Sequence, residues 1–137
     1  DYWTGVEVIG DFPIVGVQAL PLDGLNILDL IEGEYCINDE LTAVPTPGHT
    51  PGHISIAIVS AGRKGFILGD VVHSPSQASH TDWNPSFDVD PVLARQTRHS
   101  MLDRLENDRS LVSVGHFPAP GFGMFVRNEG QRYWQIA

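Results

Sequence analysis

Three strand-like segments of this sequence share the same ending: a glycine followed by a side chain that can bind a metal. His49 comes just after Leu41–Thr46, Asp70 after Phe66–Leu68, and His116 after Leu111–Val114. The glycine before each of them lets the backbone turn sharply and approach a ligand closely. If these strands belong to one sheet, the three side chains converge beyond one edge of it. This repeated ending constrains the fold more than any single motif does, because it requires segments far apart in sequence to meet.

Two imidazoles and a carboxylate form a ligand set that suits zinc or another divalent metal. Each Gly-His or Gly-Asp pair alone is more often a simple turn, so the prediction depends on their joint occurrence. The loop TPGHTPGH also holds His53, and its nearness to the next strand favours packing, or support of a ligand residue, over direct binding of a metal. Two interpretations of His73 stay open: it points into a pocket, or it is exposed.

The remaining pattern predicts a mixed α/β fold, with one helix on one face of a sheet. Asp90 is a favourable N-cap, and a proline at the first helical position is typical of a helix start, so we expect a helix to about Asn107. Its apolar face leaves Arg98 mostly outside. The preceding loop, residues 71–90, is long enough to suggest a function. Strands are expected at Glu34–Ile37, Leu41–Thr46, Ile54–Val59, Phe66–Leu68, Leu111–Val114, Met124–Arg127 and Arg132–Ile136.

Composition narrows the class of protein. Seventeen acidic against eight basic residues give a net charge of -9, which argues against nucleic acid or an anionic membrane as a partner. No apolar run approaches the roughly 20 residues of a membrane span. The single cysteine, Cys36, excludes an intrachain disulfide and is expected in the core; it favours a reducing compartment, and hence a cytoplasmic location.

The motifs TPGHTPGH, GDVVHS, FDVDP and GHFPAPGFG, in this order, resemble the C-terminal half of a metallo-β-lactamase-fold hydrolase. The resemblance covers about residues 34–127, and it is nearest to the branch of methyl parathion hydrolase and the N-acyl-homoserine lactone lactonases. It implies that His49 binds a first metal, that Asp70 bridges two metals, and that His116 binds the second. Two zinc or similar ions would serve a lactone, ester or phosphotriester substrate.

Other residues complete the expected site. Asp70 and His73 are the expected catalytic residues. Aromatic side chains of the long loop and the C-terminal segment are candidates to line a substrate pocket, although aromatic residues are often simply core: Trp83, Phe87, Phe117 and Phe122.

One part of the resemblance is missing. The superfamily takes further ligands from an HxHxDH motif, and this sequence has none. We therefore expect residues 1–137 to form a single partial domain, the C-terminal half of an αββα sandwich, inactive as a hydrolase by itself. The alternative is a non-catalytic half-domain that acts as a binding or assembly module. Either one is expected to form a homodimer or to bind the missing N-terminal half; the alternative is that residues 1–33 fold back and cover the exposed sheet face themselves.

Overall fold

The computed structural model describes residues 20–137, and Gly33–Ala137 form one compact unit, distinct from Asp1–Glu32. In the shorter unit the described part contains one helix, α3, at Leu20–Gly24. Everything predicted about the sheet and the site lies in the larger unit.

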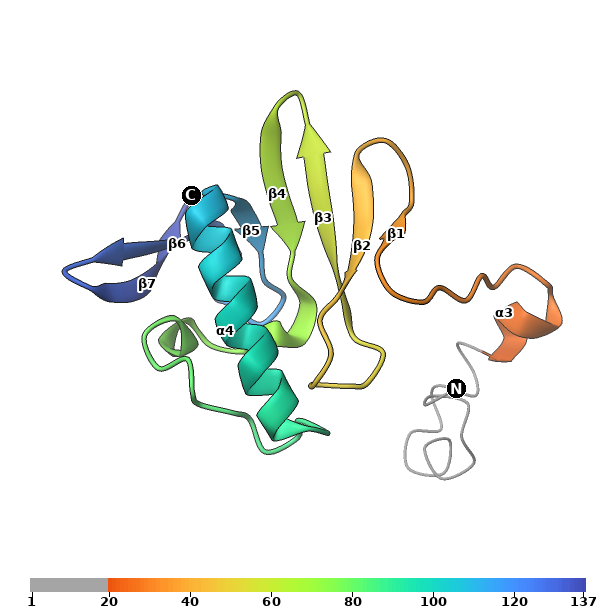
Figure 1. Cartoon of the computed structure of the whole chain (residues 1–137), viewed down its shortest axis with the longest axis horizontal. Coiled ribbons are helices and arrows are strands. Elements are labelled where there is room, and N and C mark those ends of the chain that lie inside the picture. Colours follow the sequence, from red (N-terminus) through yellow and green to blue (C-terminus); the bar gives the residue numbers. More distant parts are fainter. Residues whose placement is uncertain (1–19) are drawn as a thin grey trace. The chain divides into compact units, whose positions relative to one another are not determined.

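The larger unit is built on a seven-stranded sheet whose strands follow each other in chain order (Figure 1). Neighbouring strands are antiparallel except β4 and β5, which are parallel. A parallel pair needs a long crossover, and here residues 68–110 supply it. The strands are β1 (Tyr35–Cys36), β2 (Leu41–Pro45), β3 (Ile54–Ser60), β4 (Arg63–Ile67), β5 (Leu111–Ser113), β6 (Phe122–Asn128) and β7 (Gln131–Ile136).

The crossover contains two short 3-10 helices and the one long helix. The 3-10 helices are η1 (Gly69–Val71) and η2 (Pro75–Ala78). Helix α4 spans Pro91–Asp108, and the Asp90 side chain accepts hydrogen bonds from the amides of Val92 and Leu93, which confirms the predicted cap. The helix ends at Arg109, which has a left-handed backbone.

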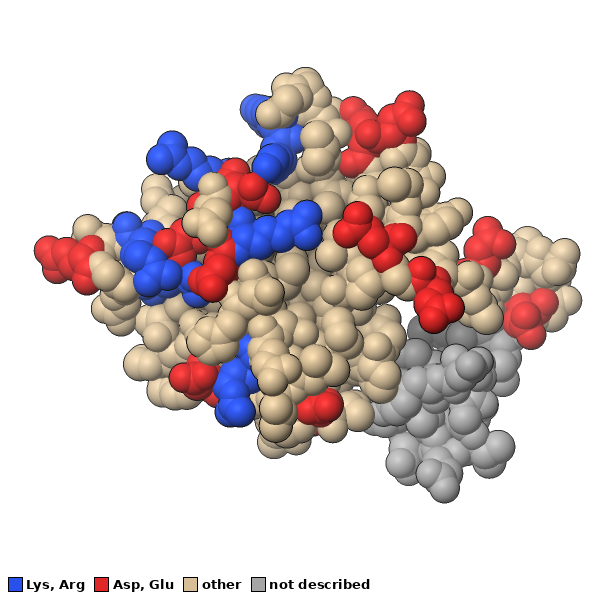
Figure 2. Space-filling view, viewed as in Figure 1, with Lys and Arg blue, Asp and Glu red and all other residues tan. Residues whose placement is uncertain are grey.

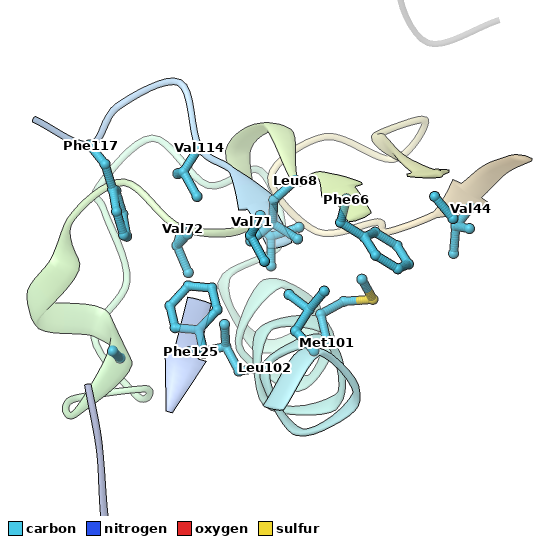
Figure 3. Close-up of a cluster of buried hydrophobic side chains, with 14 residues drawn as sticks. Val44, Phe66, Leu68, Val71, Val72, Met101, Leu102, Val114, Phe117 and Phe125 are labelled. Atoms are coloured by element: carbon cyan, nitrogen blue, oxygen red, sulfur yellow. The ribbon is translucent and has the colours of Figure 1, made fainter. Parts of the chain in front are cut away.

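The core lies between α4 and one face of the sheet (Figures 1 and 3). In Figure 3, Met101 of the helix lies toward Phe66 and Leu102 lies toward Phe125, and Leu102 is completely buried. Ala57, Phe66 and Val112 form one cross-strand row on this face. One expectation about the helix is wrong: Arg98 is fully buried, because the crossover loop folds over its side chain and supplies it with polar partners.

The opposite face of the sheet is also apolar. Because side chains alternate along a strand, Ile56 and Ile67, which are paired, point away from the row of Phe66. No element within residues 33–137 covers this face, and Ile67 and Phe122 are about half exposed, at 48% and 49%. The apolar face is made up of Leu41, Ile54, Ile56, Ile58, Ile67, Leu111, Phe122, Met124, Val126 and Tyr133.

Three further features bear on the expectations from composition. Cys36 is exposed rather than buried, because β1 is a two-residue edge strand with little packed against it. Among the described residues, no helix combines the length and the apolar character needed to cross a bilayer. On the left of the view in Figure 2, basic residues interleave with acidic ones, whereas the right of the view shows acidic residues without basic ones. Glu106, for example, pairs with both Arg127 and Arg132 at 2.7 Å.

Candidate metal centre

The structure brings His49, Asp70 and His116 together, as the repeated strand ending predicts. His49 lies in the loop between β2 and β3, Asp70 in η1 directly after β4, and His116 in the loop after β5. The Asp70 carboxylate lies at the centre: His116 Nε2 is 2.8 Å from its Oδ1, and His49 Nε2 is 3.7 Å from its Oδ2. Three segments separated in sequence therefore present ligand atoms around one carboxylate.

His73 joins this cluster, and only 13% of its side chain is exposed, so the interpretation of His73 as an exposed residue is wrong. Its Nε2 is 3.7 Å from Asp70 Oδ1, and its ring stacks on that of His116 with centroids 4.9 Å apart. Burial lowers the pKa of His73, and the neighbouring Asp70 carboxylate opposes that shift. The imidazole is thus held toward its neutral form, which is the form that binds metals or accepts a proton. Ligand atoms of Asp70, His73 and His116 lie within 4.8 Å of one another.

His53 holds the backbone that carries Asp70. Its Nδ1 lies 3.0 Å from the carbonyl oxygen of Thr46, so it donates there, and its Nε2 accepts a hydrogen bond of 2.9 Å from the Asp70 amide. Burial lowers the pKa of His53, which suits the acceptor role. Gly69 has a positive φ of 62°, and a Cβ there would lie 2.7 Å from His53 Nε2. A side chain at residue 69 would therefore disturb this contact.

His49 is oriented from its other side by Asp88. The distance from His49 Nδ1 to Asp88 Oδ1 is 3.1 Å, and the Asp88 side chain is fully buried. Because a carboxylate only accepts hydrogen bonds, Nδ1 carries the proton, and the lone pair of Nε2 points toward Asp70. A cation would stabilise this arrangement, in which the unprotonated Nε2 of His49 faces the Asp70 carboxylate at 3.7 Å. Sequence reasoning quoted Asp88 within FDVDP but assigned it no role.

The four aromatic residues predicted to line a substrate pocket lie in different surroundings. Phe87 contacts the histidine cluster edge-on, with its ring centroid 5.0 Å from that of His73 and 5.8 Å from that of His49. Trp83 stacks on His80 at 4.2 Å. Phe117 is packed in the core against Trp134 and is 7% exposed, which leaves little of it for a substrate to touch. Phe122 lies on the apolar face of the sheet. The structure thus brings only Phe87 of these four against the histidines.

The residues present fit a divalent metal. Imidazole nitrogens and a carboxylate oxygen are the donors zinc prefers, and His73 Nδ1 is buried without a hydrogen-bond partner among the described residues. His49, Asp70, His73 and His116 together supply donors for about one tetrahedral ion. They do not supply the donors of two complete ions, which would need about eight positions.

A comparison with known families agrees with this geometry. The metallo-beta-lactamase superfamily matches residues 3–116 of the sequence. The chain belongs to this superfamily.

Individual curated proteins match part of the sequence. An N-acyl homoserine lactonase of Bacillus thuringiensis is 26% identical over 87 residues, which are 64% of this chain and 34% of that protein. The lactonase of Bacillus cereus matches to the same extent. The match thus spans about a third of the length of these curated relatives.

Solved structures show the same fold. The hydrolase AbOPH of the beta lactamase superfamily has a TM-score of 0.81 at 23% identity, over 96% of this chain and 45% of its own. AidC, a dizinc quorum-quenching lactonase in complex with a product, has a TM-score of 0.73 at 24% identity, over 88% of this chain and 46% of its own. At these identities the likeness supports the fold, and the chemistry must be argued from the site.

Proposed function

We propose that this chain contributes one half of the metal site of a hydrolase that opens a lactone or cleaves an ester or phosphotriester. The observation that carries the proposal is the convergence of His49 and His116 on Asp70. The curated relatives are lactonases, which favours a lactone over the other two substrates. Bound zinc or a similar ion would polarise the substrate's carbonyl or phosphoryl oxygen.

Each ligand has a proposed place. His49 would bind a first metal, His116 a second, and Asp70 would bridge them, since its two oxygens face different imidazoles. His53 would keep the Asp70 backbone in place through the amide hydrogen bond. With the ligands divided in this way, each of the two ions would need further ligands that this chain does not supply.

His73 is the proposed proton-transfer residue. It lies beside Asp70, and its pKa is lowered by burial, so a neutral imidazole is available to accept a proton from water or from the substrate. Phe87, which covers one side of His73 and His49, would shield the reacting atoms from bulk water. Asp70 and His73 are thus the proposed catalytic pair.

The site is proposed to be completed outside this sequence. The sequence has no HxHxDH motif, and the match reaches only about a third of the lactonases. We expect the 137-residue chain alone to bind metal weakly and to hydrolyse nothing at a useful rate, because missing ligands remove most of the coordination free energy.

The apolar face supports a second candidate function, a non-catalytic module for binding or assembly. A contiguous apolar patch of this kind is rare on a monomer. We propose that it packs against a second sheet, either that of another copy in a two-fold dimer or that of the missing N-terminal half. In the first case the chain acts as an assembly module, and in the second it is part of the enzyme.

Two measurements test the proposal. The DNA upstream of the codon for Asp1 is sequenced, and the extended protein is assayed for zinc content and for opening of an N-acyl homoserine lactone. We expect an in-frame HxHxDH motif, about two zinc ions per chain, and activity that Asp70→Asn abolishes. Zinc binding and lactone opening that survive Asp70→Asn would contradict the proposed site, and an extended protein without activity would favour the assembly module.

A further inference from the structure

Arg98 is the most unusual side chain of α4, because it is a charged residue with no exposed surface. Its guanidinium donates to four oxygen atoms of the crossover loop. These are the carbonyls of Val71 and Trp83 at 2.8 Å, the Asn84 Oδ1 at 2.8 Å, and the carbonyl of Thr81 at 3.1 Å. The planar fork of arginine can serve several acceptors at fixed angles, which lysine cannot do.

Two of the contacts of Arg98 lead directly to proposed metal ligands. Its Nη2 lies 3.5 Å from Asp88 Oδ2, and the other oxygen of Asp88 accepts the Nδ1 proton of His49. Its Nε donates to the carbonyl of Val71, the residue that follows Asp70 in the chain. One guanidinium therefore contacts the support of the His49 ring and the backbone beside Asp70.

Helix α4 and its N-cap also hold the backbone of the His49 loop. The Thr97 hydroxyl donates to the carbonyl of Pro47 at 2.6 Å, and the Asp90 amide donates to the carbonyl of Gly48 at 2.9 Å. With this backbone fixed, the geometry between His49 and Asp70 can still change in two ways: the His49 ring can rotate, and η1 can shift relative to the His49 loop. The contacts of Arg98 act on both of these.

We propose that Arg98 is a positioning residue that sets the orientation of His49 and the separation between His49 and Asp70. A merely structural arginine would stabilise the crossover loop without affecting the imidazole. A positioning arginine also keeps Asp88 in place as the acceptor of the Nδ1 proton, and so keeps the Nε2 lone pair toward Asp70. The consequence for metal binding rests on the proposed function, whereas the consequence for the His49 tautomer does not.

The test uses the 137-residue chain with Arg98→Met, which keeps the aliphatic stem, and Arg98→Lys, which keeps the charge without the fork. Arg95→Met is the matched control, since Arg95 is a partly exposed arginine three residues earlier in the same helix. The tautomer of His49 is read from long-range proton–nitrogen NMR spectra of the metal-free protein at pH 8. Zinc affinity is measured by competition with a chromophoric chelator, and folding by circular dichroism.

We expect wild type and Arg95→Met to show His49 protonated at Nδ1, and Arg98→Lys to show a mixture of tautomers while remaining folded. Zinc affinity should fall by about 10- to 100-fold in Arg98→Lys, as for other losses of support around a ligand. Arg98→Met should show the same changes or a greater loss of folding. A folded Arg98→Lys chain with the wild-type tautomer and unchanged zinc affinity overturns the inference, even if it melts earlier. If the wild-type chain alone binds zinc too weakly to measure, which the proposed function allows because the chain supplies only part of the ligands, the tautomer of His49 decides on Arg98 by itself, and the proposed function is judged on the extended protein.

Discussion

Replacing Gly48 with alanine should destabilise the chain strongly, whereas the same replacement at Gly52 should not. The two glycines occupy equivalent places in the repeated Pro-Gly-His of the TPGHTPGH loop. Gly48 has a φ of 130°, and a Cβ there would lie 2.2 Å from the backbone nitrogen of Ala94 in α4. A Cβ on Gly52 would meet nothing within 4 Å. The sequence repeat is therefore not a structural repeat.

The magnitude follows from two contributions. A non-glycine residue in a sparsely populated backbone region costs about 1–3 kcal/mol. The new Cβ is more than about 1 Å short of normal van der Waals separation, so the loop must move away from α4. That movement weakens the Thr97–Pro47 and Asp90–Gly48 hydrogen bonds, each worth about 0.5–1.5 kcal/mol. We expect the free energy of unfolding to fall by about 3 kcal/mol.

Urea unfolding, followed by circular dichroism, measures this difference. Gly48→Ala should lower the free energy of unfolding as calculated and the melting temperature by about 10 °C, and it should weaken zinc binding because His49 moves with the loop. Gly52→Ala should be neutral or slightly stabilising, since alanine reduces the entropy of the unfolded chain. If the two variants agree within about 0.5 kcal/mol, the close approach of Gly48 to α4 does not exist in solution.

Three other outcomes are expected. Burial lowers the pKa of His53 below its ordinary 6.5, so the unfolded chain binds more protons. Stability should therefore be complete above about pH 6.5 and fall as the pH decreases below it. His53→Gln should flatten that dependence in urea titrations at several pH values, and a slope unchanged by the substitution would contradict the assignment. Leu102→Ala, at a completely buried position of α4, should cost about 2–5 kcal/mol in the same assay; a loss below about 1 kcal/mol would mean that the helix does not pack as described. Ile67→Lys, on the apolar face, should shift sedimentation equilibrium toward a mass near the 15.0 kDa of the monomer. A wild-type chain that stays monomeric at every concentration would leave that face without a role in self-association.

The strands, the helix and three of the clustered side chains could be predicted from the sequence because their signals are local. Alternating and β-branched segments indicate strands, Asp90-Pro91 marks the start of α4, and glycine before His49, Asp70 and His116 marks each turn toward the site. The observed bounds of the longer strands differ from the predicted ones by at most a few residues, because strand ends depend on pairing as much as on the strand's own sequence.

The surroundings of the site were decided by tertiary structure alone. His73 could equally have faced solvent, and only the folding of the crossover loop turned it toward Asp70. Arg98 lies at a position where the helical pattern predicts exposure, yet the carbonyl groups of that loop make its burial favourable. Phe117 entered the core because β6 and β7 bring Phe125 and Trp134 against it. A sequence specifies which side chains can bind a metal, whereas the contacts that aim those side chains come from residues that only the folded chain brings near.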